Sequence, residues 1–202
     1  MEVHEAAPKY YPRMTPSEFL EWERQQEYKH EYVGGEIFSM SGASMNHNKI
    51  ASNIIGIVWN HLQKKECSIY PSDLRVAVKS KNSFFYPDAT IICGEPEFDD
   101  DNLKDTVKNP TVIFEILSPS TEDYDIGKKL FFYMQIESLK QYVIVDSRST
   151  HIRMTSRMEN GTWKFLELTK NTESMMISPI DLQLPLVDLY EGVNFQDEKR
   201  SP

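Results

Sequence analysis

A single charged residue, Glu115, interrupts the apolar segment Thr111–Leu117 and constrains the fold more than any other feature of the chain. Continuous runs of Val, Ile, Phe and Leu are typical of strands that are buried on both faces of a sheet. An ionised carboxylate is costly in that position unless a cation or several hydrogen-bond donors satisfy it. The sequence therefore predicts a buried strand in which Glu115 has a charged or strongly polar partner.

A second carboxylate, Asp88, opens another apolar segment, and a lysine follows on a predicted helix. The β-branched run 89–93 predicts a buried strand with Asp88 at its mouth. On the helix, Lys129 shares one face with Asp125 and Tyr133, which lie four residues before and after it. Two carboxylates from neighbouring strands and a nearby ammonium are what a divalent-metal hydrolase needs. An ordinary helix ion pair between Asp125 and Lys129 is the alternative interpretation.

Several segments spread over most of the chain resemble one protein family. Taken in order, they are similar to the family described as "putative restriction endonuclease", within the PD-(D/E)XK nuclease superfamily. The resemblance covers residues 14–193, and the ordered set of motifs is more specific than any one of them. The segments are Glu31–Met40 with His47, Phe84–Asp88, Phe114–Thr121, Asp125–Leu130 with Tyr133, and Tyr142–Asp146.

This resemblance implies an α/β (α+β) fold with a restriction-endonuclease-like core, in which helices flank a mixed central sheet and a β-hairpin is added. It also implies a Mg²⁺-dependent endonuclease that hydrolyses DNA, with Mn²⁺ as a substitute metal. Asp88, Glu115 and the backbone carbonyl of Ile116 would hold the ion, because hard cations prefer oxygen ligands. Lys129 would position the attacking water. Supporting roles are implied for Glu36, His47, Asp125 and Tyr133.

One departure from the superfamily pattern leaves three functions open. The usual lysine, two residues after the acid on the same strand, is replaced by Leu117, so Lys129 on the next helix is its counterpart. The first function is the DNA endonuclease, acting as a homodimer. The second is a nuclease fold kept as a nucleic-acid or protein binding module with weak or lost catalysis. The third is a structural protein in which Glu115 and Lys129 form a buried salt bridge.

Charge leaves the partner open as well. The net charge of -9 works against strong non-specific binding to nucleic acid, which depends on cations that neutralise phosphates. Strand alternation nevertheless places Arg153 and Arg157 on one face, which would contact either a phosphate backbone or a sister subunit. His47 is either a contact in the cleft or a capping or surface residue. Glu31 and Glu36 are either part of a metal shell or exposed residues of a hairpin.

The rest of the sequence predicts one domain, residues 14–193, between a flexible arm, 1–13, and a disordered tail, 194–202. We expect a cytoplasmic protein without a signal peptide or membrane span, and reduced thiols at Cys67 and Cys93. The predicted elements are a capped helix over 16–26, a hairpin turning at Gly34-Gly35, a helix over 46–65, a strand over 68–79, a polar loop over 95–110, a helix over 122–137, a strand over 140–146, a hairpin over 149–168, a strand or extended segment over 177–184 and a short helix over 186–190.

Overall fold

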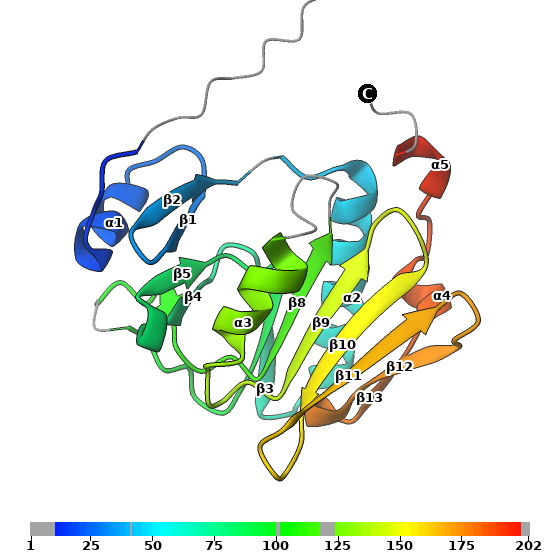
Figure 1. The fold of residues 1–202 in the computed structure, drawn as a ribbon. Coiled ribbons are helices and arrows are strands. Elements are labelled where there is room, and N and C mark those ends of the chain that lie inside the picture. The colour runs from blue at the N-terminus through cyan, green and yellow to red at the C-terminus, as the bar shows by residue number, and fades with distance from the viewer. Residues whose placement is uncertain (1–10, 41, 100–101, 118–123, 199–202) are drawn as a thin grey trace, which may run out of the picture.

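The computed structural model of the chain describes residues 11–40, 42–99, 102–117 and 124–198. Its larger sheet has six strands in the order β11-β10-β9-β8-β6-β3 (Figure 1). Strands β8 and β9 are parallel and the other neighbours are antiparallel, so the central sheet is mixed, as predicted. The strands are β3 (Cys67–Pro71), β6 (Ala89–Cys93), β8 (Val112–Leu117), β9 (Gln141–Asp146), β10 (His151–Arg157) and β11 (Trp163–Thr169).

A smaller sheet of five strands, in the order β2-β1-β5-β4-β7, contains the predicted hairpin. Its turn residues Gly34 and Gly35 have φ angles of 57° and 104°. These angles lie in the region that side chains disfavour, which explains the two glycines. The strands are β1 (His30–Val33), β2 (Glu36–Ser39), β4 (Arg75–Val78), β5 (Ser83–Phe85) and β7 (Thr106–Val107).

Helix α1 (Pro16–Glu23) begins at the predicted capping box and covers the smaller sheet. The side chain of Thr15 accepts the backbone N–H of Glu18, and the Glu18 carboxylate accepts the backbone N–H of Thr15. Phe19 is fully buried, with its ring 4.9 Å from that of Tyr32 and 5.9 Å from that of Phe84. These aromatic contacts fix α1 against β1 and β5.

Helices lie on both faces of the larger sheet. Helix α2 (Met45–Leu62) buries Ile50, Ile54 and Val58 against one face. The other face is covered by a π-helix, η2 (Tyr124–Lys129), which leads into α3 (Leu130–Tyr133). Figure 1 shows α3 in front of β8 and α2 behind the sheet. The chain is completed by the hairpin of β12 (Ser174–Ile177) and β13 (Leu182–Pro185), by α4 (Leu186–Leu189) and α5 (Phe195–Glu198), and by the 3₁₀ turns η1 (Lys79–Lys81) and η3 (Ser178–Ile180).

Several predicted elements were wrong in detail. The described part of the predicted helix 122–137 is the π-helix η2 followed by α3, which ends at Tyr133. The predicted strand 68–79 is divided between two sheets, because the chain turns after β3, where the N–H of Leu74 donates to the carbonyl of Pro71. The predicted loop 95–110 contains β7, which pairs with β4 and holds Thr106 against the buried Arg75. The predicted strand 177–184 is instead the turn and second half of a hairpin.

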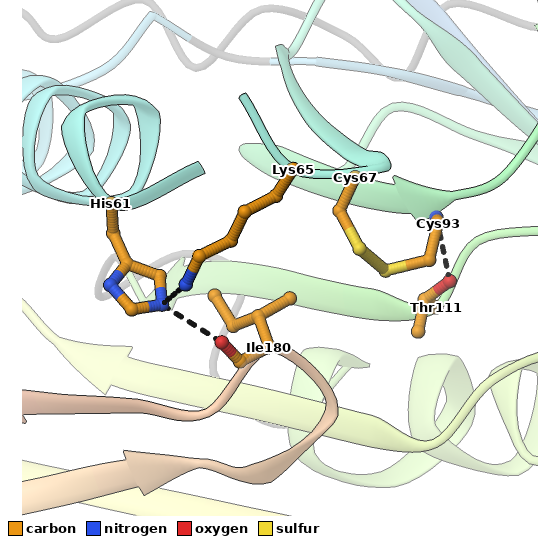
Figure 2. The surroundings of a disulfide bond; sticks show 6 residues. All are labelled: His61, Lys65, Cys67, Cys93, Thr111 and Ile180. Carbon is orange, nitrogen blue, oxygen red and sulfur yellow. Dashed lines mark hydrogen bonds between the residues drawn. A yellow bond between two sulfur atoms is a disulfide. The ribbon is translucent and has the colours of Figure 1, made fainter. Parts of the chain in front are cut away.

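The prediction of two reduced thiols was also wrong, because Cys67 and Cys93 form a disulfide bond (Figure 2). The antiparallel register of β3 and β6 places these residues directly opposite each other. The N–H of Cys93 donates to Thr111 Oγ1 on the far side of β6. The sequence prediction placed Cys93 correctly in a strand but did not predict its cross-strand neighbour.

The ends of the predicted domain lie partly outside the described residues. Residues 1–10 of the predicted arm and 199–202 of the predicted tail are not described, while α5 forms within that tail. Among the helices that the structure describes, none is long and apolar enough to cross a bilayer. A cytoplasmic location stays a prediction.

Candidate active site

Asp88 lies directly before β6, where the antiparallel pairing of β6 with β8 brings it next to Glu115. Its Oδ2 accepts the backbone N–H of Ile116 at 2.7 Å. The Asp88 carboxylate therefore contacts the peptide group that joins Glu115 to Ile116. Two acids that are 27 residues apart in the sequence meet at one place in the sheet.

His47 holds the other oxygen of Asp88. It lies in the first turn of α2, where its backbone N–H donates to Ser44 Oγ at 3.2 Å. Its Nε2 lies 2.9 Å from Asp88 Oδ1. Because an ionised carboxylate only accepts hydrogen bonds, Nε2 carries the proton in this contact. His47 therefore contacts the predicted metal ligand Asp88 directly, which favours the functional interpretation of His47.

Glu115 has the polar partners that its position requires. Its Oε1 accepts hydrogen bonds from Lys129 Nζ at 3.1 Å and from the Tyr133 hydroxyl at 2.9 Å. Glu115 and Lys129 are 3% and 5% exposed, and Tyr133 is fully buried. The spacing of Lys129 and Tyr133 therefore does bring both side chains over β8. The buried Glu115–Lys129 pair is also the contact that a purely structural role predicts.

The Tyr133 hydroxyl acts as a permanent donor in this cluster. Burial raises its pKa well above the ordinary value for tyrosine, and the negative charge of Glu115 raises it further. Tyr133 therefore stays protonated and fixes the orientation of the Glu115 carboxylate. A tyrosine in this position cannot serve as a base at neutral pH.

A third carboxylate, Glu31, enters from the smaller sheet. Its Oε1 lies 2.9 Å from Lys129 Nζ, and it accepts the backbone N–H of Tyr86 at 3.3 Å. Glu31 lies in β1, three residues before the first turn residue, Gly34, whereas Glu36 is next to the turn and exposed. Both are hairpin glutamates in the sequence, and it is the folded chain that brings Glu31 to Lys129.

Asp88, Glu115 and the Ile116 carbonyl offer oxygen donors, the kind that hard divalent cations prefer. Within the described ranges, no three His, Cys, Asp or Glu side chains converge closely enough to hold a metal ion. An ion at this position would take two protein carboxylates, from Asp88 and Glu115, and the carbonyl of Ile116. Mg²⁺ is commonly bound by one or two carboxylates, with water and substrate phosphate completing the shell. The residues present therefore suit Mg²⁺ better than a metal that demands a full protein cage.

Two other predicted features are the role of Asp125 and the basic face of β10. The side chain of Asp125 lies outside the described residues, so its predicted role stays a prediction. Of the predicted basic face, Arg153 pairs with Glu167 at 3.1 Å. Arg157 donates to the backbone carbonyls of Met134, Ile136 and Leu139 and so caps the segment after α3. The conformation of Arg157 is therefore fixed by the fold itself.

Comparison with known sequences gives consistent matches. The model of the family Uma2, described as "Putative restriction endonuclease", matches residues 16–186. Two proteins of Synechocystis sp. (strain ATCC 27184 / PCC 6803 / Kazusa), "Uncharacterized protein slr1290" and "Uncharacterized protein sll1609", are 32% and 33% identical. The alignments cover 92% and 77% of this chain, and 95% and 87% of those proteins.

Comparison with solved structures shows the fold. A crystal structure from Anabaena variabilis ATCC 29413, described as a putative nuclease belonging to DUF820, matches with a TM-score of 0.75. The match covers 90% of this chain and 99% of the other, at 16% identity. The predicted restriction-endonuclease-like architecture is thereby confirmed. With a family match that spans residues 16–186, the chain belongs to the family described as "putative restriction endonuclease".

Proposed function

We propose that this chain is a Mg²⁺-dependent endonuclease that hydrolyses DNA phosphodiester bonds. The observation that carries the proposal is the hydrogen bond from the Ile116 N–H to Asp88, because it brings both predicted acids to one place. Family membership supports a nuclease. The ammonium of Lys129 at Glu115 supplies the cation that the strand position Leu117 lacks.

Each residue of the cluster has a distinct role in this proposal. Asp88, Glu115 and the Ile116 carbonyl would hold Mg²⁺, which when bound lowers the pKa of a coordinated water and stabilises charge on phosphoryl oxygens. Lys129 would orient the attacking water and offset the charge of the scissile phosphate. His47 holds the Asp88 carboxylate through its Nε2 proton.

Cleavage of supercoiled plasmid with and without Mg²⁺ tests the activity. The variants Asp88→Asn and Glu115→Gln remove a ligand charge with little change of shape. Loss of groups that only support metal ligands costs about 10- to 100-fold, so removal of a ligand itself should cost at least about 100-fold. Asp188→Asn, an exposed aspartate in α4, is the matched control and should cleave like the wild type.

Calorimetric titration with Mg²⁺ and Mn²⁺ tests the metal independently of catalysis. We expect binding by the wild type and weaker binding by Asp88→Asn. Equal binding by both proteins, or no binding by either, would contradict the metal site. Retention of DNA without cleavage at any Mg²⁺ concentration would instead favour the binding module.

We further propose that the active unit is a homodimer. Each chain supplies one cluster of Asp88, Glu115 and Lys129, whereas a double-strand cut requires two hydrolytic events. Sedimentation velocity of the protein, alone and with a DNA duplex, measures the assembly. A monomer under both conditions that still linearises plasmid in a single binding event would contradict this proposal.

A further inference from the structure

We propose that Glu31 is a positioning residue of the active site, which holds the Lys129 ammonium against Glu115. The catalytic part of this inference rests on the proposed nuclease function. The structural part, the immobilisation of one ammonium by two carboxylates, can be measured without any cleavage assay.

Lys129 is held between acids from two different sheets. Its Nζ lies 2.9 Å from Glu31 Oε1 in β1 of the smaller sheet and 3.1 Å from Glu115 Oε1 in β8 of the larger sheet. A lysine side chain is a flexible four-carbon stem that ends in a compact charge, so one acceptor leaves its position poorly defined. Two acceptors from separate rigid elements define the position of the Lys129 ammonium.

Glu31 is itself fixed by its surroundings. The N–H of Tyr86 donates to Glu31 Oε1, and Tyr86 lies only two residues before Asp88. The Tyr86 hydroxyl donates to Glu23, which also accepts the backbone N–H of His30 at 2.9 Å. Glu31 is thus anchored through the residue before it and through the segment that carries Asp88. The same contacts link the position of Lys129 to that of the proposed metal ligand.

The burial of the cluster argues against a purely structural role for Glu31. Glu31, Glu115 and Lys129 are all buried, at 4%, 3% and 5% exposure. Neutralising Lys129 requires only one carboxylate, and a second buried carboxylate adds a desolvation cost. A carboxylate such as that of Glu31, which costs stability and still contacts the Lys129 ammonium, is expected where function requires a fixed position of that ammonium.

The first measurement observes the ammonium directly. Protons of a buried, doubly bonded lysine ammonium exchange slowly with water, so Lys129 should give a resolved ¹H–¹⁵N ammonium resonance, assigned by its loss in Lys129→Arg. In Glu31→Gln this resonance should broaden or disappear, while the melting temperature stays at or above that of the wild type. Glu36→Gln, an exposed glutamate of the same hairpin, is the matched control and should keep the resonance.

The second measurement connects the ammonium to cleavage. Glu31→Gln should lower kcat at least tenfold with KM unchanged, and Glu31→Asp, which keeps the charge, should restore part of the loss. A resonance that persists in Glu31→Gln, or activity losses that follow only a lowered melting temperature, would overturn the inference. So would failure of both Glu31 variants to fold, because Glu31 would then be a structural residue. If the wild type does not cleave DNA, the nuclease proposal fails, and the resonance alone decides whether Glu31 positions Lys129.

Discussion

Strand β8 presents two different faces, and the comparison between them separates stability from chemistry. Phe114 and Ile116 point toward α2 and pack in a cluster with its Ile54 and Val58; we call this side the α2 face. The side chain of Glu115 points the other way, toward Lys129 and Tyr133, on what we call the α3 face. Strand β8 therefore supports a hydrophobic cluster on each face, with Ile113 and Leu117 on the α3 face, and contributes the Glu115 side chain to the candidate site.

The two faces differ in what a substitution should change. On the α2 face, burial of aliphatic side chains stabilises the fold roughly in proportion to the apolar area removed from water. On the α3 face, the charged side chains of Glu31, Glu115 and Lys129 are buried together. Burial of such ion pairs contributes little net stability, but it keeps the charges in a defined geometry. Substitutions on the two faces should therefore separate effects on folding from effects on cleavage.

The largest effect on folding is expected from the α2 face. Ile54 is fully buried, so Ile54→Ala should lower the free energy of unfolding by about 2–5 kcal/mol, the usual cost of such a cavity. Urea denaturation measures it, and cleavage per folded molecule should not change. Trp59→Ala, at an exposed position of the same helix, is the control. A loss of activity in Ile54→Ala that exceeds the loss of folded protein would break the division between the faces.

The disulfide should give the next largest effect. Cys67 and Cys93 pack against the α2-face core and tie the edge strand β3 to β6. The double variant Cys67→Ser, Cys93→Ser should lose about 2–4 kcal/mol of unfolding free energy, because the reduced chain gains freedom when unfolded. Dithiothreitol should destabilise the wild type similarly and leave the variant unchanged, since the chain has two cysteines. An identical urea midpoint for the reduced and oxidised wild type would contradict this prediction.

On the α3 face, the effect on activity should exceed the effect on folding. Tyr133→Phe keeps the ring contacts and removes the hydrogen bond to Glu115, which should cost about 1 kcal/mol of stability. Activity should fall by about 10- to 100-fold, because the hydroxyl orients Glu115, the proposed metal ligand. Plasmid cleavage and urea denaturation of the same preparation measure both. Tyr70→Phe is the control, because Tyr70 is a partly buried tyrosine that packs against the same hydrophobic cluster as Tyr133. Unchanged cleavage by Tyr133→Phe would remove Tyr133 from the site.

The sequence predicted the contacts of Glu115 with Lys129 and Tyr133 better than it predicted the connections between strands. Glu115 was predictable because a charge in an apolar strand must have partners, and Lys129 and Tyr133 because helical spacing places them on one face. Glu31 could not be chosen over Glu36 by residue type, since both are hairpin glutamates. What decides between them is which strand of the smaller sheet faces α3, and that is a tertiary relation.

The same limit explains the errors in the fold. Residues 75–78 of the predicted strand 68–79 do form a strand, but local pattern does not tell which sheet a strand joins. The pairing of Cys67 with Cys93 depends on the register between β3 and β6, which the spacing of two cysteines does not contain. Individual helices and strands were therefore predictable from the sequence. Which strands pair, and in which register, could be seen only in the folded chain.

The smallest effect is expected where the α3 face continues beyond its helix, on β10 and β11. Arg153 there pairs with Glu167, whose side chain is 65% exposed, so Arg153→Gln should change stability by less than about 0.5 kcal/mol. The pair already satisfies Arg153, and a phosphate would have to displace Glu167 in a protein whose net charge is -9. DNA affinity and its salt dependence should therefore stay at wild-type values in a fluorescence anisotropy titration. A salt slope reduced by about one unit would show instead that Arg153 neutralises a phosphate. The α3 face would then extend from the proposed metal ligands to β10 as one DNA-binding surface.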